Sequence, residues 1–204
     1  MRIMSVHLPQ GIPAEVFAHW LALLPPERRS DLLSRRAASV RDRSLCGEIL
    51  ARAMLAQTLR CPPGAISISR GAHGKPELCG APNLFFNISH SGHYAVCAVS
   101  DRPVGIDIEQ QRAYRPQLAG RVCSAAEQSL LAQSRDPSQL FCRLWTLKES
   151  FVKCTGAGLG AHLNKISFSF SPDGTVRSNQ EGFYFTCRNF ADGYWLAVCQ
   201  ARRQ

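Results

Sequence analysis

The chain has 204 residues, of which 45% are hydrophobic and 19% are charged, so it can bury the core of one large domain or of two small ones. It has no apolar run of about 18 residues and no signal-peptide pattern at its N-terminus, so we expect a cytoplasmic protein with no membrane association. The net charge of +9 favours an anionic partner such as a nucleic acid, a phosphate compound or an acidic protein, although a solvated basic surface would give the same excess.

The first sixty residues favour helices. Residues 13–24 form an amphipathic pattern with Pro13 at the first helical position, and Pro25 and Pro26 end it. Residues 27–60 are rich in helix formers and predict one or two further helices.

The middle of the chain favours strands. Alternating or apolar segments bounded by turns predict strands at 65–69, 85–89, 94–100 and 104–109. Because short turns connect the last three of them, we expect residues 85–109 to form an antiparallel meander.

The last part of the chain repeats this order. Residues 121–154 favour helices, and Ser124 followed by Glu127 is a capping box. Strand patterns follow at 165–171, 183–189 and 194–200. The order of helices, strands, helices and strands predicts an α+β protein of two similar α/β halves, related by pseudo-two-fold symmetry, each with antiparallel strands packed on helices. We expect an N-terminal half at 1–105 and a C-terminal half at 106–204.

Nine cysteines are present, and most of them lie beside apolar residues. No CxxC pair occurs, so neither a zinc site nor a disulfide framework has the spacing it needs. We therefore expect mainly buried free thiols.

The segment VGIDIE places two carboxylates on one face of a strand. Asp107 and Glu109 are two residues apart, so they point to the same side, and Ile106 and Ile108 point to the other. Carboxylates held this close repel each other unless a cation or a proton lies between them, and hard oxygen ligands suit Mg²⁺. The alternative is an exposed strand face whose acids meet nearby arginines.

The segment WTLKESFVK at 145–153 combines apolar residues with three charges. Glu149 and Lys153 are spaced as an i, i+4 ion pair, which a solvated helix face would explain. Alternatively, Glu149 faces the strand carboxylates as a third acid, while Lys148 and Lys153 supply positive charge for a phosphate.

Two further segments are weak signals when taken alone. FNISHSG at 86–92 places Ser89 and His90 near a strand end, without a GxSxG pattern, and a histidine can donate to a phosphate oxygen. The tight turn Gly74-Lys75-Pro76 carries an isolated lysine.

Taken together, GKP, FNISHSG, VGIDIE and WTLKESFVK, in this order and at these intervals, resemble the 4′-phosphopantetheinyl transferases, most closely their surfactin-synthetase-type branch. The resemblance runs from about Pro26 to Val198. It implies an enzyme that moves the phosphopantetheine arm of coenzyme A onto a serine of an apo acyl or peptidyl carrier protein and releases 3′,5′-ADP. It also implies Mg²⁺ as cofactor, with Mn²⁺ as an alternative, and a monomer.

The resemblance also implies roles for single residues. It assigns Asp107, Glu109 and Glu149 to the metal, Glu149 to deprotonation of the serine, and Lys153 to the pyrophosphate. The coenzyme A contacts that it implies are Arg28, Arg43, Lys75, Ser89, His90, Lys148 and Lys153. Where the family often has a second basic residue for the 3′-phosphate, this chain has Asp31, or the basic residue is shifted to Arg29 or Arg35.

The arginine excess suits an acidic carrier protein, because opposite charge steers the encounter. We expect the docking surface in segment 110–123, which carries Arg112, Arg115 and Arg121; a solvated linker is the alternative. A nucleic-acid-binding protein would explain the charge, but no recognition-helix, zinc-finger or RNP-like pattern supports it. A nucleotide hydrolase or kinase lacks a GxxxxGK[ST] loop, and the intact acids argue against a non-catalytic coenzyme A binder.

Overall fold

The computed structural model describes residues 1–71, 74–158 and 162–203. Within these residues the chain runs twice through a strand, three helices, a 3₁₀ turn, a short hairpin and a long hairpin. The first pass comprises β1 (Arg2–His7), α1 (Ala14–Ala22), α2 (Pro26–Ser34), α3 (Ala38–Leu59), η1 (Pro63–Ala65), β2 (Ile68–Arg70), β3 (Pro76–Leu78), β4 (Phe85–Ser91) and β5 (Tyr94–Ser100). The second comprises β6 (Val104–Gln110), α4 (Pro116–Val122), α5 (Ala125–Gln133), α6 (Pro137–Thr155), η3 (Leu163–Lys165), β7 (Phe168–Phe170), β8 (Val176–Ser178), β9 (Phe183–Ala191) and β10 (Tyr194–Ala201).

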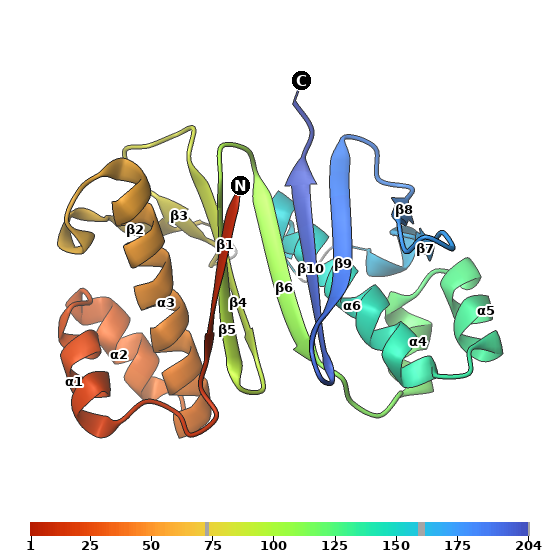
Figure 1. Ribbon diagram of the computed structural model, residues 1–204, viewed down its shortest axis with the longest axis horizontal. Coiled ribbons are helices and arrows are strands. Elements are labelled where there is room, and N and C mark those ends of the chain that lie inside the picture. The colour runs from red at the N-terminus through yellow and green to blue at the C-terminus, as the bar shows by residue number, and fades with distance from the viewer. Residues whose placement is uncertain (72–73, 159–161, 204) are drawn as a thin grey trace.

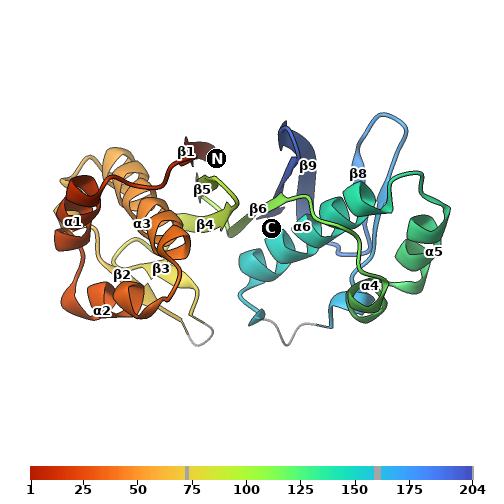
Figure 2. The same ribbon diagram turned by 90° about the horizontal axis from the view of Figure 1, so that it is seen from below.

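The two halves have equivalent sheets. The strand order is β1-β5-β4 in one half and β6-β10-β9 in the other, and all these pairings are antiparallel. The short hairpins β2-β3 and β7-β8 form separate two-stranded sheets. The main sheets lie in the middle of the molecule, with α1, α2 and α3 towards one end and α4, α5 and α6 towards the other (Figures 1 and 2). The expected α+β fold of two similar halves is confirmed.

Each half has its own hydrophobic core, and a further core joins the two. In the first half, Ala51 and Leu55 of α3 pack with Cys97 and Val99 of β5. Between the halves, the other face of β5 meets β6 and β10 through Val96, Ala98, Ile106, Ile108, Leu196 and Val198. Strand β5 is therefore buried on both faces, which explains its nearly continuous apolar sequence. The expectation that Ile106 and Ile108 point away from Asp107 is confirmed.

Side-chain hydrogen bonds bridge the two main sheets. The backbone N–H groups of Ile106, Ile108 and Gln110 on β6 donate at 2.9, 3.3 and 3.1 Å to side-chain oxygens of β4. The three acceptors are Asn87 Oδ1, Ser89 Oγ and Ser91 Oγ. Both sets of positions advance by two along the chain, so β4 and β6 run parallel. We call this set of bonds the inter-sheet ladder.

A glycine lets α6 approach β6 closely. A Cβ atom at Gly105 would overlap with the carbonyl oxygen of Ser150 and the backbone nitrogen of Cys154, both on α6. Any larger residue would push the helix away from the strand. Because the helix lies this close, the side chain of Lys153 reaches Asp107 on the neighbouring strand.

The expected meander is wrong for its last strand. Strands β4 and β5 form the predicted hairpin, but β6 pairs with β10. The physical reason is that β5 has no free edge, since β4 pairs with one side and β1 with the other.

The sequence analysis missed two elements. One is β1, and the other is α4 at Pro116–Val122, within a segment for which a linker was the alternative. Strand β6 begins at Val104, so the expected boundary between 105 and 106 cuts this strand.

The cysteines agree with the expectation of mainly buried free thiols. All nine cysteines are free, and six are buried; Cys61 and Cys187 are partly buried, and Cys79 is exposed. In the described part of the chain, no helix combines the length and the hydropathy needed to cross a membrane. The capping box at Ser124 and Glu127 is confirmed, since each side chain bonds the other residue's backbone N–H.

Candidate active site between the two halves

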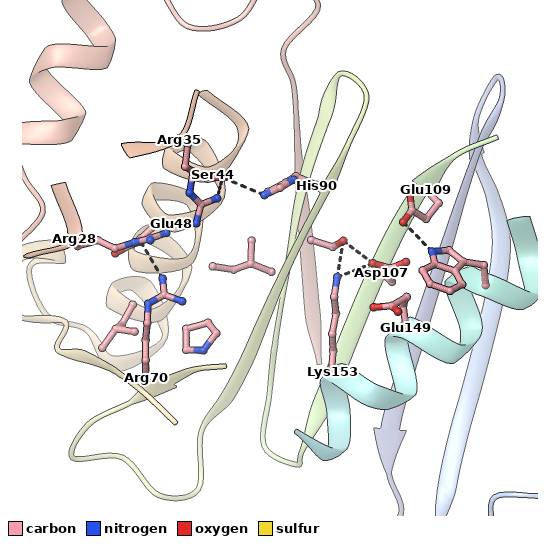
Figure 3. A pocket seen from close by; sticks show the side chains of 15 residues that line it. Arg28, Arg35, Ser44, Glu48, Arg70, His90, Asp107, Glu109, Glu149 and Lys153 are labelled. Atoms are coloured by element: carbon pink, nitrogen blue, oxygen red, sulfur yellow. Dashed lines mark hydrogen bonds and ion pairs between the residues drawn. The ribbon is translucent and has the colours of Figure 1, made fainter. Parts of the chain in front are cut away.

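A pocket of about 370 Å³ opens between the halves and has two walls of opposite character. The first half lines it with Arg28, Arg35 and Arg70, which we call the basic wall. The second half lines it with Asp107, Glu109, Glu149 and Lys153, which we call the acidic wall. Figure 3 shows the three arginines on one side and the three carboxylates with Lys153 on the other. The pocket therefore suits a ligand with several anionic groups.

Asp107, Ser89 and Lys153 form a triangle of hydrogen bonds, and the carboxylate of Asp107 is buried. Its Oδ1 accepts from Lys153 Nζ at 2.6 Å and from Ser89 Oγ at 2.7 Å, and Lys153 Nζ lies 2.9 Å from Ser89 Oγ. Its Oδ2 is buried and has no hydrogen-bond partner among the residues that the structure describes. Burial raises the pKa of Asp107 to about 7, an effect that Lys153 opposes and Glu109 reinforces.

The other two carboxylates differ in how firmly they are held. Glu109 accepts at Oε1 from Trp145 Nε1 at 3.1 Å and at Oε2 from Ser91 Oγ at 2.9 Å, so both its oxygens have partners. Glu149 Oε1 is buried and has no hydrogen-bond partner in the described part of the chain. Burial raises the pKa of Glu149, while the nearby Lys153 lowers it and Glu109 raises it further. Glu149 is thus a stronger base than an exposed carboxylate.

The donor set of the acidic wall fits a hard divalent cation. It offers carboxylate oxygens, and two of them, Asp107 Oδ2 and Glu149 Oε1, are buried with no hydrogen-bond partner in residues 1–71, 74–158 and 162–203. Within the described ranges, however, no three His, Cys, Asp or Glu side chains converge closely enough to hold a metal. Lys153, at Asp107 Oδ1, supplies the positive charge next to these acids.

His90 lines the pocket and is connected through Ser44 to Arg35 of the basic wall. Its Nε2 lies 3.2 Å from Ser44 Oγ, which accepts from Arg35 Nη1 at 2.6 Å. Burial, together with the positive charges of Lys153, Arg43 and Arg35, lowers the pKa of His90 to about 4. The imidazole is therefore neutral at pH 7 and can donate one hydrogen bond.

A buried carboxylate organises the basic wall. Glu48 accepts from Arg28 Nε at 2.5 Å and pairs with Arg52 Nη2 at 3.4 Å and Arg70 Nη2 at 4.0 Å. Arg52 is anchored in turn on the carbonyl of Ile66 at 2.6 Å. Glu48 thereby holds guanidinium groups from three different elements in one place. Figure 3 shows two of these arginines, Arg28 and Arg70, beside Glu48. Burial, with Arg28 next in effect, lowers the pKa of Arg70, which fits a cluster of like charges.

Seven of the sequence-predicted residues line this pocket: Arg28, Ser89, His90, Asp107, Glu109, Glu149 and Lys153. Arg29 and Arg35 were the two alternatives for the second basic residue at the 3′-phosphate. Arg35 lines the pocket, whereas Arg29 donates to the carbonyls of Leu24 and Ala22. Asp31 pairs with Arg28 and Arg35.

The expectation that Lys148 contacts the ligand is wrong. Its side chain is fully buried, pairs with Glu127 at 2.8 Å and donates to the carbonyls of Leu163 and Ile166. Lys148 and Lys153 are five residues apart on α6, a rotation of about 140°, so they point to different sides of the helix. Lys148 therefore neutralises a buried glutamate in the core of the second half.

Lys75 and Arg43 lie next to this pocket but do not line it. Lys75 Nζ donates to the carbonyl of Cys154 at 2.9 Å, and Lys75 directly precedes Pro76, which does line the pocket. Arg43 donates to the carbonyl of Gly92 at 2.9 Å and lines a second pocket. The second pocket shares His90, Glu109 and Trp145 with the first and extends over Arg112, Arg115, Leu118 and Phe141.

The sequence analysis missed several residues of the site. Arg70 and Glu48 lie in no motif, and only their meeting across α3 and β2 marks them. Trp145 is one of the apolar residues of WTLKESFVK and had no role in the predicted site, yet its indole N–H orients Glu109. Ser91 lies two residues after Ser89 in FNISHSG, and this period-two spacing was the signal that could have identified it.

The low pKa of His90 predicts how stability depends on pH. The unfolded histidine binds a proton below about pH 6.5, whereas the folded one binds it only near pH 4, so acidification favours unfolding between these values. The contribution is at most about 3 kcal/mol. H90Q lacks this group, so thermal or urea unfolding should show that it loses less stability than the wild type between pH 7 and pH 4.

The control is H19Q, at an exposed position on α1, which should keep the pH dependence of the wild type. Parallel stability curves for the wild type and H90Q would contradict the buried, neutral state of His90.

Comparison with known proteins supports one assignment for this site. The family model for the 4′-phosphopantetheinyl transferase superfamily matches residues 103–199, and a model for the N-terminal part of a 4′-phosphopantetheinyl transferase matches residues 13–102. The 4′-phosphopantetheinyl transferase Sfp of Bacillus subtilis is 31% identical over 98% of this chain and 92% of its own length. The 4′-phosphopantetheinyl transferase gsp of Aneurinibacillus migulanus is 34% identical over 98% of this chain and 85% of its own length.

Among solved structures, a holo-[acyl-carrier-protein] synthase from Neisseria meningitidis has a TM-score of 0.43 and 18% identity over 50% of this chain and 98% of that one. The relative from Bacillus subtilis exceeds 30% identity over almost the whole length of both chains. The chain belongs to the 4′-phosphopantetheinyl transferase superfamily.

Proposed function

We propose that this protein transfers the 4′-phosphopantetheine arm of coenzyme A to a serine of an apo acyl or peptidyl carrier protein, with Mg²⁺, and releases 3′,5′-ADP. The observation that supports this most is one pocket with three arginines facing three carboxylates and a lysine. Coenzyme A needs both walls, because its nucleotide part is anionic and its pyrophosphate is the group that reacts. Membership of the superfamily supports the same reaction.

Asp107, Glu109 and Glu149 would hold the metal once they have moved closer together, because in the described residues no three such side chains converge closely enough. Asp107 Oδ2 and Glu149 Oε1 have no partner among the described residues, whereas Glu109 would have to exchange its bonds with Trp145 and Ser91 for the metal. When bound, Mg²⁺ would neutralise charge on the pyrophosphate oxygens, and Mn²⁺ would find the same oxygen ligands.

The protein's own residues position the reacting groups. Lys153 places its ammonium beside Asp107, where it can also bind a pyrophosphate oxygen. Glu149 acts as the base that takes the proton of the incoming serine, and its raised pKa suits this role. The serine oxygen then bonds to the β-phosphorus, the bond to the bridging oxygen breaks, and 3′,5′-ADP leaves. Phosphoryl transfer of this kind depends mainly on positioning and charge neutralisation.

The nucleotide part of coenzyme A would lie along the basic wall. Arg28 and Arg35 offer guanidinium groups to its phosphates, and neutral His90 can donate one hydrogen bond. Ser89 already donates to Asp107, so its effect is to hold the acidic wall in place. Arg43 and Lys75 support the pocket from its two ends through backbone carbonyls.

The carrier protein would dock over the second pocket, next to the reacting groups. Arg112 and Arg115 are exposed there, beside Leu118 and Phe141, and an acidic partner would meet both charge and apolar surface. Because both walls of the first pocket come from one chain, a monomer has a complete site.

Substitution of the proposed base tests the reaction. E149Q should lose at least about 99% of the transfer rate, because general-base catalysis contributes about 100-fold or more, and it should keep its thermal stability. The measurement is intact-mass spectrometry of an apo carrier protein after incubation with coenzyme A and Mg²⁺, with EDTA in a parallel sample.

The matched control is E181Q, which removes an exposed carboxylate outside the pocket and should keep normal activity. Normal turnover by E149Q would contradict its role as base, and no mass gain on any carrier with the wild type would contradict the proposed reaction.

Removal of the two exposed arginines tests the docking surface. The double variant R112A/R115A should lower kcat/KM for an acidic carrier by about tenfold, because opposite charge accelerates association, and it should leave the Kd of coenzyme A unchanged. R177A removes an exposed charge on β8 and serves as control. Unchanged kcat/KM in the double variant would place carrier docking elsewhere.

A further inference from the structure

Two carboxylates contact the arginines of the basic wall, and they differ in exposure. The side chain of Glu48 is 7% exposed on α3, whereas that of Asp31 is 52% exposed on α2. Glu48 contacts three arginines, and a rotation of its side chain away from them would leave buried positive charges unpaired. Asp31 can turn into water at little cost, because exposed ion pairs are weak.

Asp31 occupies guanidinium groups that would otherwise be free to bind a ligand. Its Oδ2 contacts Arg28 Nη1 and lies 3.7 Å from Arg35 Nη2, so one oxygen is shared by two arginines that line the pocket. The remaining contacts of these arginines differ: Arg28 Nε bonds the buried Glu48, and Arg35 Nη1 bonds Ser44. A phosphate oxygen binds arginine through the same N–H groups that Asp31 now takes.

The charges around this cluster do not balance. Four guanidinium groups, those of Arg28, Arg35, Arg52 and Arg70, surround two carboxylates, which leaves an excess of two positive charges. A phosphate monoester carries about 1.5 to 2 negative charges at pH 7. The cluster can therefore accept a monoester, and it would do so more strongly without Asp31.

We propose that Asp31 is an internal competitor for the phosphate monoester of coenzyme A. In the free protein its carboxylate neutralises Arg28 and Arg35, and it gives way when the monoester binds, while Glu48 keeps the guanidinium groups oriented. This inference rests on the proposed function and adds to it a residue that sets the affinity and specificity for the 3′-phosphate. It predicts opposite effects for the two acids, because Asp31 competes with the ligand and Glu48 supports its site.

The test compares coenzyme A with 3′-dephospho-coenzyme A, which lacks the monoester. Binding is measured by isothermal titration calorimetry on the full chain, at fixed ionic strength and without carrier protein. D31N should bind coenzyme A with a Kd about fivefold lower than that of the wild type. The Kd for 3′-dephospho-coenzyme A should change less than about twofold. E48Q should bind coenzyme A more weakly than the wild type.

The matched control is E27Q, which removes an equal charge from the same helix at an exposed position with no ion pair among the described residues. Its Kd values should equal those of the wild type. An unchanged or weaker affinity of D31N, or an equal gain in E27Q or for 3′-dephospho-coenzyme A, would overturn the role of Asp31. If the wild type bound neither nucleotide, the proposed function itself would fail.

Discussion

The inter-sheet ladder between β4 and β6 is the interaction on which the rest of the structure depends. Ser89 and Ser91 each accept a backbone N–H of β6 and donate to the carboxylate of the residue before it, so they bond Ile108 with Asp107 and Gln110 with Glu109. The same bonds thus join the two halves and orient two acids of the site. Because the N–H groups of Ile106 and Ile108 are buried, leaving one of them unpaired costs about 1–3 kcal/mol, which fixes the register of the two strands.

The division of the pocket into two walls follows from this junction. Each half brings a different charge to the pocket. Helix α2 with the residue after it and strand β2 bring arginines around Glu48 of α3, and β6 and α6 bring carboxylates with Lys153. The basic wall alone lacks the carboxylates and Lys153, and the acidic wall alone carries excess negative charge, so the pocket needs both halves. The repeat of one architecture, with different residues on equivalent elements, therefore produces an asymmetric site from a nearly symmetric fold.

Local patterns in the sequence were enough to predict the period-two face of Asp107 and Glu109, the capping box at Ser124 and the order of helices and strands. The partner of β6 could not be predicted, because it depends on β10, some 85 residues later in the chain, and on β1 occupying the edge of β5. The orientation of Lys148 could not be predicted either, since a helix alone does not tell which side faces the pocket. Arg70 and Glu48 meet only in the folded chain.

The most direct test of this account is the free energy of unfolding of N87A, because Asn87 belongs to the inter-sheet ladder but does not line the pocket. The substitution leaves the buried N–H of Ile106 without its acceptor, so urea unfolding should show a loss of about 1–3 kcal/mol. The control N189A, exposed on β9, should stay within about 0.5 kcal/mol of the wild type. Equal stability of both variants would contradict the claim that this ladder holds the two halves, and with them the site, together.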